Sequence, residues 1–280
     1  MIYLLLNMIC GAMLSIVIRF SEGRVRSSTG MIACNYLTCM VMAGCFLGFG
    51  GRLLPSAEGF GKTFGLGMLN GVFFMTAMMA NRYNIKRVGM VLPSLFSKLG
   101  ALLVPLVISI FLFGEMPGVL QVAGFALAIV AIVLMNLRSG KQNVTPSATL
   151  FLLLLTEGLA SSMSKVYRET GNPVLSDHFL LFTFTSAFLL CIIVLLLKHE
   201  RLGGKELLFG AMIGIPNFLA ARFVLKALEA LPAIIVYPCR SVGTIVIITL
   251  AGLFIFKERL SRRQVIAMLV IFVALVLLNI

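Results

Sequence analysis

The chain has 280 residues, of which 60% are hydrophobic and 12% are charged, and its mean hydropathy is +1.07. A water-soluble domain carries about 25% charged residues, so this composition excludes a soluble globule and favours a protein dissolved in a bilayer. The formal net charge is +13, but most Lys and Arg residues fall between apolar runs, where such residues set orientation and contact lipid headgroups. We therefore expect the chain to contact a lipid bilayer and to bind no nucleic acid.

Apolar segments follow one another along the whole chain. A transmembrane helix needs about 20 mostly apolar residues. Ten segments meet this requirement: residues 2–19, 31–50, 62–81, 88–113, 118–137, 148–167, 178–197, 207–228, 232–256 and 263–280. No basic residue precedes the first segment, which favours a retained helix over a cleaved secretion signal. The sequence predicts an all-α integral membrane protein with ten transmembrane helices.

The two halves of the chain resemble each other. Glu115 and Gln121 recur 143 residues later as Glu258 and Gln264. At the same offset, residues 130–137 align with the last eight residues of the chain, and five of these eight positions are identical. Chance similarity between apolar segments accounts for the Val, Ala and Leu matches, but less readily for Glu, Gln and Asn in register. The sequence therefore predicts a duplication.

The predicted repeats comprise residues 1–138 and 148–280, joined by a linker at residues 139–147. Each repeat holds five helices, an odd number, so the second repeat must enter the membrane from the opposite side. Inverted repeats of this kind are typical of secondary transporters, which bind substrate near the membrane midplane.

Each half also has a proline near the start of its fourth predicted helix, Pro93 or Pro238, and a similar closing pattern. The patterns are Phe111-Leu112-Phe113-Gly114-Glu115-x5-Gln121 and Phe254-Ile255-Phe256-Lys257-Glu258-x5-Gln264. In these features the chain resembles the EamA-like members of the drug/metabolite transporter superfamily. The resemblance implies a carrier that works by alternating access, with helices 1, 3, 4, 6, 8 and 9 around a central cavity and helices 5 and 10 at the periphery. It implies export or exchange of amino acids, other metabolites, drugs, nucleotide sugars or sugar phosphates.

The resemblance and the distribution of basic residues disagree about orientation. The resemblance implies a protein of the plasma (cytoplasmic or inner) membrane with both termini in the cytoplasm. That placement leaves five Lys and Arg residues in the cytoplasmic connections and fifteen in the others. Because basic residues accumulate in cytoplasmic loops, the count favours both termini outside.

Four ionisable residues stand out because they lie deep within the predicted helices, away from the helix ends or on the cavity helices: Lys98, Glu157, Arg222 and Arg240. A charge inside the membrane costs several kcal/mol, so such a residue normally faces the protein interior and has a partner or a function. All four belong to helices that the resemblance places around the cavity. We predict that they bind substrate, although Arg222 lies close enough to a helix end to reach the interface instead.

Polar residues share helix faces with these charges, because residues three or four apart are neighbours on a helix. Ser94 shares a face with Lys98, and Tyr237 and Ser241 share one with Arg240 beside Pro238. The predicted substrate-binding set is completed by two asparagines: Asn70 and Asn217. The alternative for each single Ser or Asn is helix packing. Packing is also what we expect of three Gly-x3-Gly patterns, at Gly67, Gly44 and Gly210, and we expect Glu115 and Glu258 to anchor the helices that follow them.

Three cations against one acid favour a substrate with a carboxylate or phosphate. If Glu157 instead pairs internally with one of the cations, the cavity is nearly neutral and suits zwitterions such as amino acids. Glu157 is also a candidate for proton coupling. We therefore expect a secondary active exporter or exchanger of a small amino-acid-like or anionic metabolite, working as a monomer or homodimer.

Two other functions compete with this one. The first is export of lipophilic cations, including drugs. The second is an integral-membrane enzyme, which would need a nucleophile with a base or clustered histidines and carboxylates. The sequence shows neither, and the six cysteines lie in apolar stretches, where they serve as small hydrophobic residues. We predict no catalytic residues, no metal and no cofactor.

Overall fold

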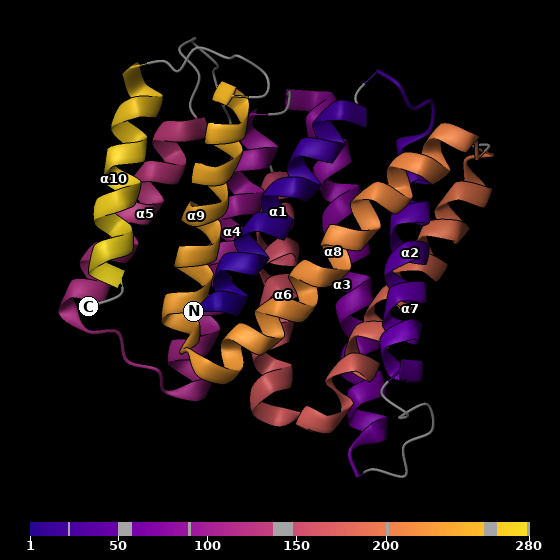
Figure 1. Cartoon of the computed structure of the whole chain (residues 1–280), viewed down its shortest axis with the longest axis horizontal. Helices are drawn as coiled ribbons and strands as arrows, with labels where there is room; N and C mark the ends of the chain where they lie inside the picture. The colour runs from indigo at the N-terminus through magenta and orange to yellow at the C-terminus, as the bar shows by residue number, and fades with distance from the viewer. Residues whose placement is uncertain are drawn as a thin grey trace. The chain divides into compact units, whose positions relative to one another are not determined.

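The computed structural model describes residues 1–21, 23–49, 58–88, 91–136, 148–199, 202–254 and 262–278. In these ranges the chain forms ten α-helices and one 3-10 helix, and no strand (Figure 1). The elements are α1 (Ile2–Ser21), α2 (Ser28–Phe49), α3 (Phe60–Val88), α4 (Val91–Phe113), α5 (Val119–Asn136), α6 (Ala148–Thr170), η1 (Pro173–Leu175), α7 (Ser176–Leu197), α8 (Gly204–Ala230), α9 (Ala233–Phe254) and α10 (Arg262–Leu278). The prediction of a membrane protein made of ten helices is confirmed in the described part of the chain.

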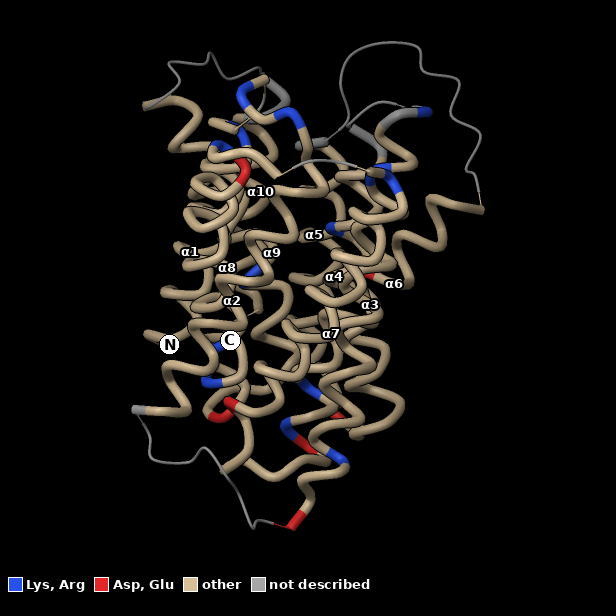
Figure 2. The backbone as a smooth tube through the Cα atoms, turned by 90° about the vertical axis from the view of Figure 1, so that its right-hand side faces the viewer, with Lys and Arg blue, Asp and Glu red and all other residues tan. Residues whose placement is uncertain are grey.

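Eight of the described helices are long and apolar enough to cross a membrane. Two described helices have shorter apolar parts, Val119–Leu134 in α5 and Val265–Leu278 in α10, and a membrane span requires 18 residues. The prediction of ten full-length spans therefore holds for eight of the described helices. Most charged residues lie toward the ends of the helices, and few lie along their middle (Figure 2).

The third helix extends further than its hydropathy predicts, from Phe60 to Val88 instead of ending near Asn81. No proline or glycine occurs between Asn81 and Val88. The side chain of Asn84 donates hydrogen bonds to Ala80 O (2.8 Å) and Thr149 O (3.0 Å), and accepts one from Thr149 Oγ1 (2.8 Å). The polar end of α3 is therefore held by its own turn and by the start of α6.

Several sequence predictions fall outside the described residues. These are the linker at residues 139–147, Glu258 and its surroundings, the side chain of Gln264 and the final two residues of the chain.

The chain divides into two compact units, and each unit takes helices from both predicted repeats. Unit 1 comprises Thr76–Lys165 and Ala230–Ile280 together with Met1, and unit 2 comprises Ile2–Met75 and Val166–Glu229. Unit 1 thus contains α4, α5, α9, α10 and most of α6. Unit 2 contains α1, α2, α7, α8 and the first half of α3.

In unit 1, α5 lies along α10, and α4 packs against α9. The core between them consists of small and branched side chains: Leu102, Ala128, Ala131, Ile132, Val242, Ile271 and Ala274. Gly124 allows α5 and α10 to approach closely, because a Cβ atom there would lie 3.1 Å from Ala274 O. Lipid tails are as apolar as these side chains, so the packing depends on close fit between the helices.

In unit 2, α2 and α7 lie side by side, and glycines let two further helices approach them. A Cβ atom on Gly71 of α3 would lie 2.5 Å from Thr183 O of α7, and one on Gly214 of α8 would lie 2.8 Å from Asn35 O of α2. The preceding glycines of each pattern, Gly67 and Gly210, are equally crowded. The packing role predicted for these two patterns is confirmed.

The prediction for the third glycine pattern is wrong. Cβ atoms on Gly44 and Gly48 of α2 would meet nothing within 4 Å, so no described helix packs closely there. The α2 face that approaches α8 carries Cys34, Asn35 and Thr38 instead.

Candidate substrate-binding site

The tight crossing of α4 and α6 brings two of the predicted residues into one region of unit 1. A Cβ atom on Gly158 would lie 2.7 Å from Gly100 O, and one on Gly100 would overlap the carbonyl oxygen of Leu154. Lys98 lies two residues before Gly100, and Glu157 lies directly before Gly158. Lys98 and Glu157 are therefore each within one helical turn of the crossing.

A hydrogen bond connects α9 to the same part of α6. Tyr237 is 1% exposed, and its hydroxyl group donates to Ser161 O at 3.0 Å. Glu157 lies one turn before Ser161, and Arg240 lies one turn after Tyr237. Glu157 and Arg240 interact electrostatically. Unit 1 thus brings together Glu157, Tyr237 and Arg240 of the predicted set, and Lys98 lies on α4, which crosses α6 next to Glu157.

Among the described residues, the three charged side chains of this set make no hydrogen bond and no ion pair. Lys98, Glu157 and Arg240 are all half-buried. Ser94 and Ser241, on the same helices, are also half-buried. Charges in the membrane interior are costly unless water, an ion or a ligand compensates them, so this arrangement suits the binding of a polar molecule.

The two predicted asparagines lie in unit 2, where both donate to a neighbouring helix. Asn70 Nδ2 donates to Thr183 Oγ1 of α7 at 3.3 Å, and Asn217 Nδ2 donates to Asn35 Oδ1 of α2 at 3.2 Å. Both bonds join helices that the glycine patterns already hold together. The hydrogen bonds that these two asparagines donate therefore serve helix packing. Their role in substrate binding stays a prediction.

Arg222 also lies in unit 2, where it is paired. Its Nε and Nη2 atoms contact the two carboxylate oxygens of Asp177 at 3.0 and 3.1 Å, and its guanidinium lies 4.1 Å from the centre of the Phe46 ring. Asp177 stands in the first turn of α7, outside the predicted helix, and sequence reasoning did not select it. This ion pair, with one hydrogen bond from Nη2, compensates the charge of the arginine within unit 2.

Glu115 has a structural role different from the one expected. It accepts hydrogen bonds from Ala233 N (3.4 Å) and Ile234 N (3.3 Å), at the start of α9, and pairs with Lys165 Nζ at 2.5 Å. A carboxylate at a helix N-terminus satisfies unpaired N–H groups and offsets the helix dipole. Glu115 therefore anchors α9, not the next helix in the sequence.

The family comparison agrees with this architecture. Residues 146–280 match the EamA-like transporter family. The second half of the chain is therefore EamA-like. EamA-like proteins form part of the drug/metabolite transporter superfamily, so the protein is an integral membrane transporter of that type.

A solved crystal structure extends the likeness to nearly the whole EamA-like chain. It is 15% identical in sequence, and the alignment covers 99% of this chain and 94% of the other, with a TM-score of 0.76. At this identity the likeness shows the fold alone. No curated protein matches the sequence.

Proposed function

We propose that this EamA-like transporter is a secondary active carrier that exports or exchanges a small amino-acid-like or anionic metabolite by alternating access. The observation that carries the proposal is the set of three half-buried charges on α4, α6 and α9, which have no direct partner among the described residues. Lys98 and Arg240 are two positive charges beside the single carboxylate of Glu157. Their excess favours a substrate with a carboxylate or a phosphate.

The types of charge in this set suit an amino acid in particular. A guanidinium binds a carboxylate through two parallel hydrogen bonds, and an ammonium such as Lys98 adds a third charge-assisted donor. Glu157 can accept from the ammonium group of the same substrate. Glu157 is also the residue we propose for proton coupling, because it is the one acid of the set.

Internal symmetry supports the alternating-access part of the proposal. The close helix pairs α2 with α7, α4 with α9 and α5 with α10 each join helices of equal rank in the two predicted repeats. The crowded glycines also repeat, because Gly67 and Gly71 recur 143 residues later as Gly210 and Gly214. Two related halves that exchange conformations are the usual basis of alternating access in secondary transporters.

The test is counterflow in proteoliposomes that contain the purified protein. Labelled amino acids, dicarboxylates and sugar phosphates are offered to the wild type and to Lys98→Gln and Arg240→Gln. Loss of one charge-assisted hydrogen bond is worth about 1.5–3 kcal/mol, so each variant should weaken apparent affinity by roughly 10- to 150-fold. Lys205→Gln, at an exposed position of α8, is the matched control and should leave transport unchanged.

The same assay includes the main alternative. If Lys98→Gln and Arg240→Gln retain full transport of every anionic and zwitterionic substrate, the proposal is wrong. Transport confined to lipophilic cations, and improved by these substitutions, would instead identify a drug exporter that uses Glu157.

A further inference from the structure

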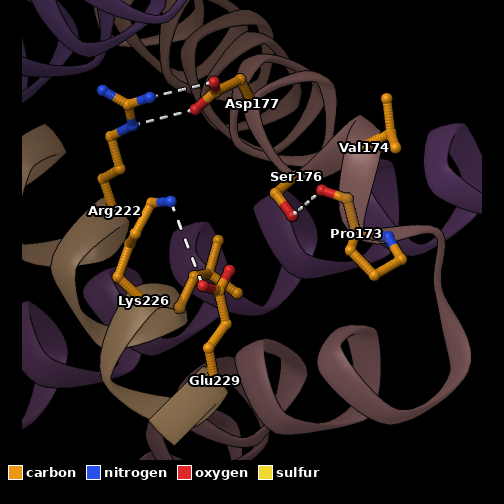
Figure 3. A pocket seen from close by; sticks show the side chains of 8 residues that line it. Pro173, Val174, Ser176, Asp177, Arg222, Lys226 and Glu229 are labelled. Carbon is orange, nitrogen blue, oxygen red and sulfur yellow. Dashed lines mark hydrogen bonds and ion pairs between the residues drawn. The ribbon is translucent and has the colours of Figure 1, made fainter.

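A cavity of about 140 Å³ lies within unit 2, where α7 begins and α8 ends (Figure 3). At about 30 Å³ for each water molecule, the space is equivalent to roughly five waters, enough for a small polar group. Its charged lining consists of Asp177, Arg222, Lys226 and Glu229. Pro173, Val174 and Leu225 contribute apolar surface.

The four charges form two pairs of different tightness. Arg222 and Asp177 make two contacts of 3.0 and 3.1 Å, and their side chains are 25% and 26% exposed. Lys226 and Glu229 are 4.0 Å apart, and their side chains are 43% and 39% exposed. Such an exposed pair contributes at most about 1 kcal/mol. The first pair therefore closes one side of the cavity, whereas Lys226 and Glu229 can separate at little cost to receive a ligand.

We infer that this cavity binds a zwitterion in which a primary ammonium accompanies a phosphate or carboxylate. Lys226 receives the anionic group, and Glu229 accepts hydrogen bonds from the ammonium. A ligand with a single charge would compensate one member of the loose pair and leave the other unpaired, whereas a zwitterion compensates both. The aliphatic surface of Val174 and Leu225 accommodates the carbon atoms between the two groups.

Two sources supply this chemistry. One is a membrane lipid with an ethanolamine headgroup, because the cavity lies at the ends of two membrane-spanning helices, the level at which headgroups are found. The other is a free zwitterionic metabolite in solution. The inference does not rest on the proposed function, because the cavity uses none of the unit 1 residues Lys98, Glu157 and Arg240.

Calorimetric titration of the full-length protein in detergent distinguishes these cases. The probes are phosphoethanolamine and dihexanoyl-phosphatidylethanolamine, each compared with its choline analogue. Trimethylammonium has no N–H group and cannot donate to Glu229. We expect the ethanolamine probes to bind at least tenfold more tightly than the choline probes. Equal binding of the free headgroup and the short-chain lipid indicates a soluble ligand, and binding of the lipid alone indicates a membrane lipid.

Substitutions test the residues directly. Lys226→Gln and Glu229→Gln should each abolish the preference for ethanolamine, and because both side chains are partly exposed we expect these variants to fold. The matched controls are Glu58→Gln and Lys62→Gln, which remove the same two charges from exposed positions of unit 2 and should retain the preference. Equal affinity for ethanolamine and choline probes, or an unchanged preference in both cavity variants, would overturn the inference. Lys98→Gln should bind the probes normally even if it transports nothing.

Discussion

Alanine substitution of two glycines in unit 2 tests the helix packing, because Gly71 and Gly44 belong to separate Gly-x3-Gly patterns and only Gly71 is crowded by a neighbouring helix. The Cβ atom of Gly71→Ala would lie 2.5 Å from both Ser186 Cβ and Thr183 O. Ordinary carbon contacts lie at about 3.5–4.0 Å, so α3 and α7 must separate by roughly 1 Å. Overpacking of this kind costs about 1–3 kcal/mol.

Gly44→Ala is the matched control. A Cβ atom there meets nothing within 4 Å, and alanine in a helix interior is more favourable than glycine by about 0.5–1 kcal/mol. We therefore expect Gly44→Ala to leave the melting temperature unchanged or to raise it, and Gly71→Ala to lower it by several degrees. Gly214→Ala, the counterpart of Gly71 in the second predicted repeat, should behave like Gly71→Ala.

The assay is thermal unfolding of the purified protein in one detergent. Because the chain contains no Trp, unfolding is followed by thiol labelling and not by intrinsic tryptophan fluorescence. Five of the six cysteines are buried, so unfolding exposes new thiols. Equal shifts for Gly71→Ala and Gly44→Ala would refute the reasoning, because the two substitutions would then differ from wild type only in helix propensity.

Three further predictions concern other parts of the chain. Glu115→Gln removes one partner of an ion pair whose side chains are 6% and 17% exposed, so it should destabilise the protein by about 3 kcal/mol, whereas a loss under 1 kcal/mol in thermal unfolding would contradict this. Tyr237→Phe deletes the hydrogen bond to Ser161 and should lower stability by about 1 kcal/mol in the same assay, an effect that unchanged unfolding would disprove. The distribution of Lys and Arg predicts both termini outside, so alkaline phosphatase fused to the C-terminus should be active, and a fluorescent cytoplasmic reporter there would reverse the assignment.

Much of the secondary structure could be predicted from the sequence. Apolar runs separated by turn residues predicted each of the ten helices, because a helix in lipid must satisfy its own backbone groups over a length set by the bilayer. The prediction ended α3 too early, since hydropathy reports the apolar part of a helix and not its polar extension past Asn81.

Side-chain partners were harder to predict. The sequence singled out Arg222 and Glu115 but not their partners, because Asp177 and the start of α9 lie 45 and 118 residues away. Glycine spacing predicted close packing correctly at Gly71 and wrongly at Gly44. The same Gly-x3-Gly pattern occurs in both places, and only the presence of a neighbouring helix distinguishes them.

The amino-acid sequence by itself determined the solvent, the helices and the transporter family of this protein, because each of these follows from composition or from matches along the chain. Only the tertiary structure decided which intramembrane charges are compensated within the protein. Lys165 and Arg222 pair with carboxylates, whereas Lys98 pairs with none in the described part of the chain. The physical reason is that a charge is compensated by contacts of about 3 Å, and such contacts form between helices that are distant in sequence.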